Sequence, residues 1–184
     1  MASELRVDKI VPTGGVGSDT TDQRHGGGII QIVEKVYSTQ QTITQTSPQD
    51  IFSASITPKF STSKILIIVF LMYDWTRSNS GGGFKLFRGG SELTDARGDA
   101  YGSMYRVAAD FGANANQDQS GMTRSIVYLD SPGSTSSIEY RVYAWAISNA
   151  QLTVCGSQYG NGTTNQSDDG RFISTYTVME IGGS

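Results

Sequence analysis

Hydrophobic residues gather in short runs along this chain, and the longest run, Lys64 to Trp75, is apolar at both odd and even positions. Its β-branched and aromatic residues favour a strand, and successive side chains of a strand point to opposite faces. An antiparallel sheet usually turns one polar face to water. A strand that is apolar on both faces needs cover on both sides, and we expect another subunit to supply part of that cover.

Other interpretations of this run are weaker. A membrane-spanning helix needs about 20 apolar residues, and the run is much shorter. A buried helix is disfavoured because Ile, Val, Phe and Tyr are only moderate helix formers. A central strand of a parallel sheet would need crossover helices on both sides, and the sequence contains no convincing helical pattern.

Turn residues separate further segments with strand patterns. These segments are Ile29 to Tyr37, Thr42 to Thr44, Gln49 to Phe52, Ala54 to Thr57, Phe84 to Arg88, Met122 to Leu129, Ile138 to Ile147, Gln151 to Cys155 and Phe172 to Ile181. About eight to ten short strands without a strong helix are typical of an all-β antiparallel sandwich or barrel. Because several strands are apolar on both faces, the pattern favours a trimer or a larger ring.

Residues 1–28 differ from the rest of the chain. They contain too few hydrophobic residues to form a core, and their many glycines disfavour a helix. We therefore predict an extended N-terminal arm with a Gly-rich hinge over residues 1–28, followed by a β-sandwich head over residues 29–184. The apolar residues of the arm are the candidates for anchoring it, namely Leu5, Val7, Ile10 and Val11.

The composition excludes several classes of partner. Hydrophobic residues make up 37% of the chain, charged residues only 17%, and the net charge is −3. Without a basic run, nucleic acid is not expected as a partner, and no segment is suited to membrane insertion. The N-terminus lacks the apolar core of a signal peptide, so we expect synthesis in the cytoplasm. The single cysteine, Cys155, permits no internal disulfide and reads as a small buried hydrophobe.

Few residues in the chain are suited to catalysis. The only histidine, His25, lies beside three glycines, where no packing would hold it for acid–base work. Asp168 and Asp169 offer a weak calcium site without the spacing of an EF-hand. Glu92, Asp95 and Asp99 lie close in sequence, but two of them could serve as a glycosidase pair only at a set separation, which sequence does not show. We expect no enzyme activity, no cofactor and no metal.

Recognition chemistry is better represented in the loops. Two of them are rich in Tyr, Ser, Gly and Asn, a mixture that combines rigid aromatic contact area with adaptable hydrogen bonds. The candidate receptor-binding residues are Tyr101, Tyr105, Tyr159 and Asn161. Ordinary solvated loops, with tyrosines packed on the sandwich, are the alternative.

Several motifs together carry a resemblance to a known family. They are SELRVDKIVPTGG, GGGIIQIVEKVYST, SITPKFSTSKILIIV, FKLFRGG, YLDSPGSTSSIEYRVYAW and STYTVMEIGG. With these motifs the chain resembles short tail-fibre and other fibre-like virion proteins of marine and cyanobacterial tailed phages. The resemblance implies an arm that inserts into the virion and a jelly-roll head, similar to the C1q and tumour-necrosis-factor modules and typically homotrimeric. The chain departs from long fibres because it has no extended shaft.

The resulting hypothesis is a virion protein, a phage tail fibre whose trimeric head attaches to a host receptor or glycan. A capsid fibre or decoration protein with a purely structural role is the alternative, and a polysaccharide depolymerase is a third possibility. Within the doubly apolar strand, Lys64 and Asp74 bracket one set of side chains, which we expect to fill the sandwich: Leu66, Ile68, Phe70 and Met72. The other set is then expected to face the trimer: Ile67, Val69, Leu71 and Tyr73.

Overall fold

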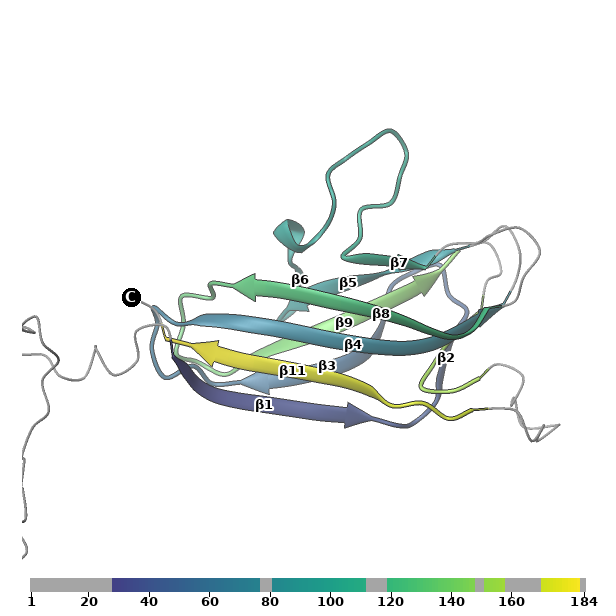
Figure 1. The fold of residues 1–184 in the computed structure, drawn as a ribbon. Coiled ribbons are helices and arrows are strands. Elements are labelled where there is room, and N and C mark those ends of the chain that lie inside the picture. Colours follow the sequence, from purple (N-terminus) through teal and green to yellow (C-terminus); the bar gives the residue numbers. More distant parts are fainter. Residues whose placement is uncertain (1–27, 77–80, 112–118, 148–150, 158–169, 183–184) are drawn as a thin grey trace, which may run out of the picture.

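The computed structural model describes residues 28–76, 81–111, 119–147, 151–157 and 170–182. In these ranges the chain forms two antiparallel sheets packed face to face (Figure 1), which confirms the predicted all-β sandwich. The strands, with one 3-10 helix, are β1 (Ile29–Tyr37), β2 (Gln41–Ile43), β3 (Gln49–Ile56), β4 (Lys64–Thr76), β5 (Gly82–Arg88), β6 (Ser91–Glu92), η1 (Thr94–Ala96), β7 (Ala109–Phe111), β8 (Gln119–Asp130), β9 (Ile138–Ala146), β10 (Gln151–Val154) and β11 (Ser174–Ile181).

The first sheet is organised around the long strand β4. Strand β8 pairs with one edge of β4 along most of its length. The other edge is shared, because β11 pairs with the first half of β4 and β10 with the second half. Strands β1 and β2 then flank β11 and β10. Figure 1 shows β1, β11, β4 and β8 of this sheet side by side.

The second sheet has the order β3-β9-β5, with β6 and β7 both pairing with the far edge of β5. Beyond β2, the chain changes sheet at almost every connection between the longer strands, as in a jelly roll. The first strand and the last strand are neighbours. The N–H of Gly182 donates a 2.8 Å hydrogen bond to the carbonyl of Gly28, so both ends of the described fold lie at the same end of the sandwich.

The core lies between the two sheets and follows the alternation of the strands. In β9, Tyr140, Val142 and Ala144 are fully buried, whereas the residues between them lie on the outer face of the second sheet. Aromatic rings fill one end of the core, where the ring centroids of Tyr73 and Phe84 are 5.7 Å apart. Burial of this apolar area is the main source of the stability of the fold.

The structure reverses the prediction for the two faces of β4. Ile67, Val69, Leu71 and Tyr73 are at most 1% exposed and lie in the sandwich core, so the prediction that they face neighbouring subunits is wrong. Their neighbours Leu66, Ile68, Phe70 and Met72 lie on the outer face instead. The polar ends that suggested the opposite assignment belong to the outer face: Lys64 is exposed, and Asp74 is covered by a segment whose Ser157 hydroxyl donates to its carboxylate at 3.2 Å.

Candidate recognition surfaces

One surface is the outer face of the first sheet, which stays apolar across four strands. The register places Leu129, Leu66, Met179 and Ile32 in one row across β8, β4, β11 and β1. We call this surface the outer apolar face, and its apolar members are Ile29, Ile32, Val36, Leu66, Ile68, Phe70, Met72, Val127, Leu129, Met179 and Ile181. Contiguous apolar surface of this kind marks a site of interaction.

Exposure confirms that this face is uncovered within one chain. Val127 is 65% exposed and Val36 is 60% exposed, although both belong to regular strands. Polar side chains also lie on this face: Glu34 and Thr177 are paired across β1 and β11, and Thr175 and Ser125 flank Phe70. The structure therefore agrees with the expectation that the sheet around β4 is apolar on both sides, with the outer side formed by the even-numbered residues of β4.

The second surface is the segment between β6 and β7, residues 93–108. It begins with η1 and then forms a loop that projects from the sandwich (Figure 1). Hydrogen bonds close the base of this loop: the Gly98 N–H donates to the Val107 carbonyl at 3.2 Å, and the Arg106 side chain donates to the Gly98 carbonyl at 2.8 Å. At the tip, the Met104 N–H bonds the Tyr101 carbonyl at 3.1 Å.

The tip of this loop carries exposed apolar and aromatic side chains. Tyr101 is 77% exposed, Met104 70% and Tyr105 64%. The ring of Tyr105 also contacts Trp145 edge-on, with centroids 6.1 Å apart, so the loop is fastened to the outer face of the second sheet. Tyr101 and Tyr105, two of the predicted receptor-binding residues, thus belong to one loop and are accessible.

Charged groups surround the point where the loop meets the sheet. The Lys85 ammonium lies 5.4 Å from the Trp145 ring centroid and 3.0 Å from the Glu92 carboxylate. Arg97 donates to the same carboxylate at 3.2 Å. Gly83 makes room for this arrangement, because a Cβ at that position would come within 2.5 Å of Val107 and 2.8 Å of Trp145.

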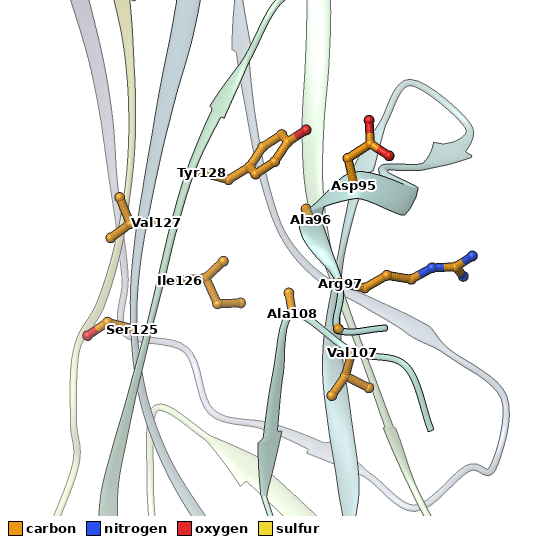
Figure 2. A pocket seen from close by; sticks show the side chains of 10 residues that line it. Asp95, Ala96, Arg97, Val107, Ala108, Ser125, Ile126, Val127 and Tyr128 are labelled. Atoms are coloured by element: carbon orange, nitrogen blue, oxygen red, sulfur yellow. The ribbon is translucent and has the colours of Figure 1, made fainter. Parts of the chain in front are cut away.

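A cavity of about 370 Å³ lies between the same segment and strand β8. One wall is formed by Asp95, Ala96, Arg97, Gly98, Val107 and Ala108, and the other by Ser125, Ile126, Val127 and Tyr128. Figure 2 shows the side chains of Ile126 and Tyr128 directed into the cavity, and those of Ser125 and Val127 directed away from it. This cavity could not be predicted from local sequence, because its walls are about 20 to 30 residues apart in the chain and neither wall carries a motif.

The Tyr128 hydroxyl and the Asp95 carboxylate lie at the same end of the cavity (Figure 2). Burial raises the pKa of Tyr128, and the negative charges of Asp130 and Asp95 raise it further. The hydroxyl is therefore protonated at neutral pH and can donate a hydrogen bond. The Arg97 side chain points away from the cavity in Figure 2, toward its partner Glu92.

No protein-family model matches this sequence, and no curated protein matches it significantly.

Other predicted residues lie outside the described ranges. These are Tyr159 and Asn161 of the second predicted loop, the anchoring residues Leu5, Val7, Ile10 and Val11, His25, and the calcium candidates Asp168 and Asp169. Among the described residues, no three His, Cys, Asp or Glu side chains are grouped to hold a metal ion. Within the same ranges, no helix has the length and apolar character needed to cross a membrane.

Cys155 is fully buried, as its sequence neighbours predicted. Its thiol donates weak hydrogen bonds to the Tyr37 carbonyl at 3.3 Å and to the Ser174 hydroxyl at 3.4 Å. Burial raises the pKa of this thiol, although the bonds with Ser174 partly oppose the change. A buried thiol with a raised pKa is a poor nucleophile.

Proposed function

We propose that this chain is a short attachment protein of a tailed-phage virion, in which residues 1–28 bind a virion protein and a homotrimeric sandwich presents loops to the host surface. The outer apolar face is the observation that carries the assembly part of this proposal. A face with Val127 65% exposed and Ile32 55% exposed loses apolar contact with water when a neighbouring subunit covers it. The resemblance of the sequence motifs supports the virion context.

The arrangement of the two surfaces favours recognition as the role of the head. The outer apolar face belongs to the first sheet, whereas the 93–108 segment is fastened to the outer face of the second sheet by the contact between Tyr105 and Trp145. Covering the first surface therefore leaves the outer face of the second sheet uncovered. Exposed tyrosines on a hydrogen-bonded loop suit adhesion, because they bring contact area at a small cost in conformational entropy.

Two experiments test this proposal. Analytical ultracentrifugation of the purified protein should give a trimer at micromolar concentration, and a monomer would contradict the assembly part. Soluble head protein, residues 29–184, should compete with phage particles for adsorption to host cells. If it does not compete, the head is a structural decoration of the tail or capsid, which is the alternative role.

The arm is tested separately. Particles assembled with a chain that lacks residues 1–28 should not contain the protein, while the isolated head stays folded. Particles that incorporate the truncated chain at the normal level would contradict the anchoring role of Leu5, Val7, Ile10 and Val11.

A further inference from the structure

We propose that the cavity between β8 and the 93–108 segment binds one neutral sugar residue of a host-surface glycan. This inference rests on the proposed attachment function for the source of the sugar, and on the geometry of the cavity for its chemistry. The cavity volume of about 370 Å³ falls in the range of roughly 300–1,000 Å³ that is usual for ligand-binding sites.

The two walls offer the mixture of polar and apolar groups that a sugar ring requires. Ile126 projects into the cavity from β8, and Ala108 and Val107 lie across from it (Figure 2). Within the described part of the chain, β8 pairs only with β4. The N–H and C=O groups along its other edge are therefore available to a ligand beside Ser125 to Tyr128.

One end of the cavity carries both a donor and an acceptor. The Tyr128 hydroxyl donates and the Asp95 carboxylate accepts, and Figure 2 shows both groups at that end. A sugar hydroxyl both donates and accepts, so two adjacent hydroxyls of one ring match this pair. The Tyr128 ring adds an aromatic surface against which the C–H groups of the ring can pack.

The charge around the cavity argues for a neutral ligand. Asp95 lies at the same end of the cavity as the Tyr128 hydroxyl, and the two nearby cations are engaged elsewhere: Arg97 turns away to Glu92, and Arg88, whose charge also acts on Tyr128, is paired with Asp130. A phosphate or an acidic sugar would meet the Asp95 carboxylate there and would have to compete with Glu92 or Asp130 for a cation, which is unfavourable. Hexoses and deoxyhexoses without a charged group are therefore the class that fits.

The binding test uses the purified full-length chain and a panel of free glucose, galactose, mannose and rhamnose, followed by saturation-transfer NMR and calorimetry. At least one sugar is expected to bind with a millimolar dissociation constant. Ala108→Phe, which fills the cavity, should abolish binding, and Asp95→Asn should weaken it at least tenfold. The matched control Asp99→Asn changes the same residue type on the same segment outside the cavity and should bind as the wild type does.

Tyr128→Phe separates an effect on binding from a loss of folding, because it removes only the hydroxyl and keeps the ring. This variant is expected to show wild-type circular dichroism and binding weakened severalfold. The proposal is overturned if none of the four sugars binds, or if Ala108→Phe binds as tightly as the wild type. Failure of a maleimide to label Ala108→Cys in the assembled protein would also overturn it, because a neighbouring subunit would then close the cavity.

Adsorption assays separate this inference from the attachment function. If the full-length wild-type protein and its Ala108→Phe variant block phage adsorption equally, the cavity proposal is wrong and the attachment function stands. If the wild-type protein binds sugar through the cavity but does not block adsorption, the cavity site stands and the attachment function is wrong. If the wild-type protein blocks adsorption and the Ala108→Phe and Asp95→Asn variants do not, both proposals are supported.

Discussion

The hydroxyl of Tyr140 donates a 2.6 Å hydrogen bond to the carboxylate of Asp130 inside the sandwich. Arg88 approaches both oxygens of the same carboxylate at 2.9 Å, and Asp130 is only 5% exposed. A carboxylate in such a place is tolerated only when it is paired and hydrogen-bonded. This group therefore ties the ends of β5, β8 and β9 together, at the end of the fold where β8 finishes.

Removing the Tyr140 hydroxyl should destabilise the fold. Tyr140→Phe leaves the ring in place but deprives the buried carboxylate of a donor, so we expect the free energy of unfolding to fall by about 1.5–3 kcal/mol. Urea denaturation followed by tryptophan fluorescence measures this change. An unchanged midpoint would show that Arg88 alone satisfies the carboxylate.

Tyr176 offers a matched control for that substitution. Its hydroxyl is buried and has no hydrogen-bond partner among the described residues, and burial raises its pKa. Tyr176→Phe should therefore leave the stability unchanged or increase it, by at most about 1–3 kcal/mol, because an unsatisfied buried group is removed. A marked loss of stability in the same urea assay would mean that the hydroxyl has a partner.

Glu180 should make the fold sensitive to acid. Burial alone would raise the pKa of this carboxyl, but hydrogen bonds outweigh burial and hold its pKa below the ordinary value of 4.5. The donors include the Gln31 side chain at 2.6 Å and the Lys59 N–H at 2.7 Å. A lowered pKa in the folded state stabilises the protein above the unfolded pKa, and this contribution is lost as the pH falls through the folded pKa.

The measurement is the free energy of unfolding between pH 7 and pH 3 for the wild type and for Glu180→Gln. Below pH 4.5, the free energy of unfolding of the wild type should fall with decreasing pH, and Glu180 is expected to contribute up to about 1.4 kcal/mol per pH unit to this slope. The variant should lack the contribution of Glu180. Equal slopes in the two proteins would contradict the assignment. Glu139→Gln is not a suitable control, because the pKa of Glu139 is also lowered, by Arg141.

A charge on the outer apolar face should dissociate the oligomer without unfolding the subunit. Val127 is 65% exposed in the single chain, so Val127→Asp costs the isolated sandwich little but places an unpaired charge in the proposed interface. Sedimentation should show a monomer with the circular dichroism of a β-sandwich. Ser55→Asp, on an exposed position of β3, should stay trimeric, and dissociation of both variants alike would argue against the interface.

The thiol of Cys155 should report on opening of the sandwich. Because it is fully buried and burial raises its pKa, we expect a thiol reagent at pH 8 to react with the native protein much more slowly than with the urea-unfolded protein. The rate under native conditions then measures the population of open states. Labelling as fast as in urea would show that the end of β10 opens freely.

The strand pattern could be predicted well from the sequence where the side chains alternate. Strand β1 begins and ends at the predicted residues Ile29 and Tyr37, and β9 begins at the predicted Ile138 and ends one residue before the predicted Ile147. Strands β6 and β7 were missed because pairing with β5, rather than local sequence, makes them strands. The predicted segments Gln49 to Phe52 and Ala54 to Thr57 form one strand, β3, with a register shift between Asp50 and Phe52.

The faces of β4 and the cavity lay beyond the reach of local pattern. When both parities of a strand are apolar, alternation does not tell which set is inside, and the neighbouring strands decide. Val178 of β11 is buried beside Ile67, and this pairing fixes the odd-numbered residues of β4 in the core. The cavity brings Ala108 opposite Ile126, a juxtaposition that only the packing of the two sheets creates.

The hydrogen bond between Gly28 and Gly182 places the entry and the exit of the described fold side by side. A domain with adjacent ends tolerates insertion into an exposed loop of another protein and circular permutation. The sandwich can thus be inserted as one unit into another protein, for example into a scaffold that displays many copies, while the 93–108 segment stays on the second sheet.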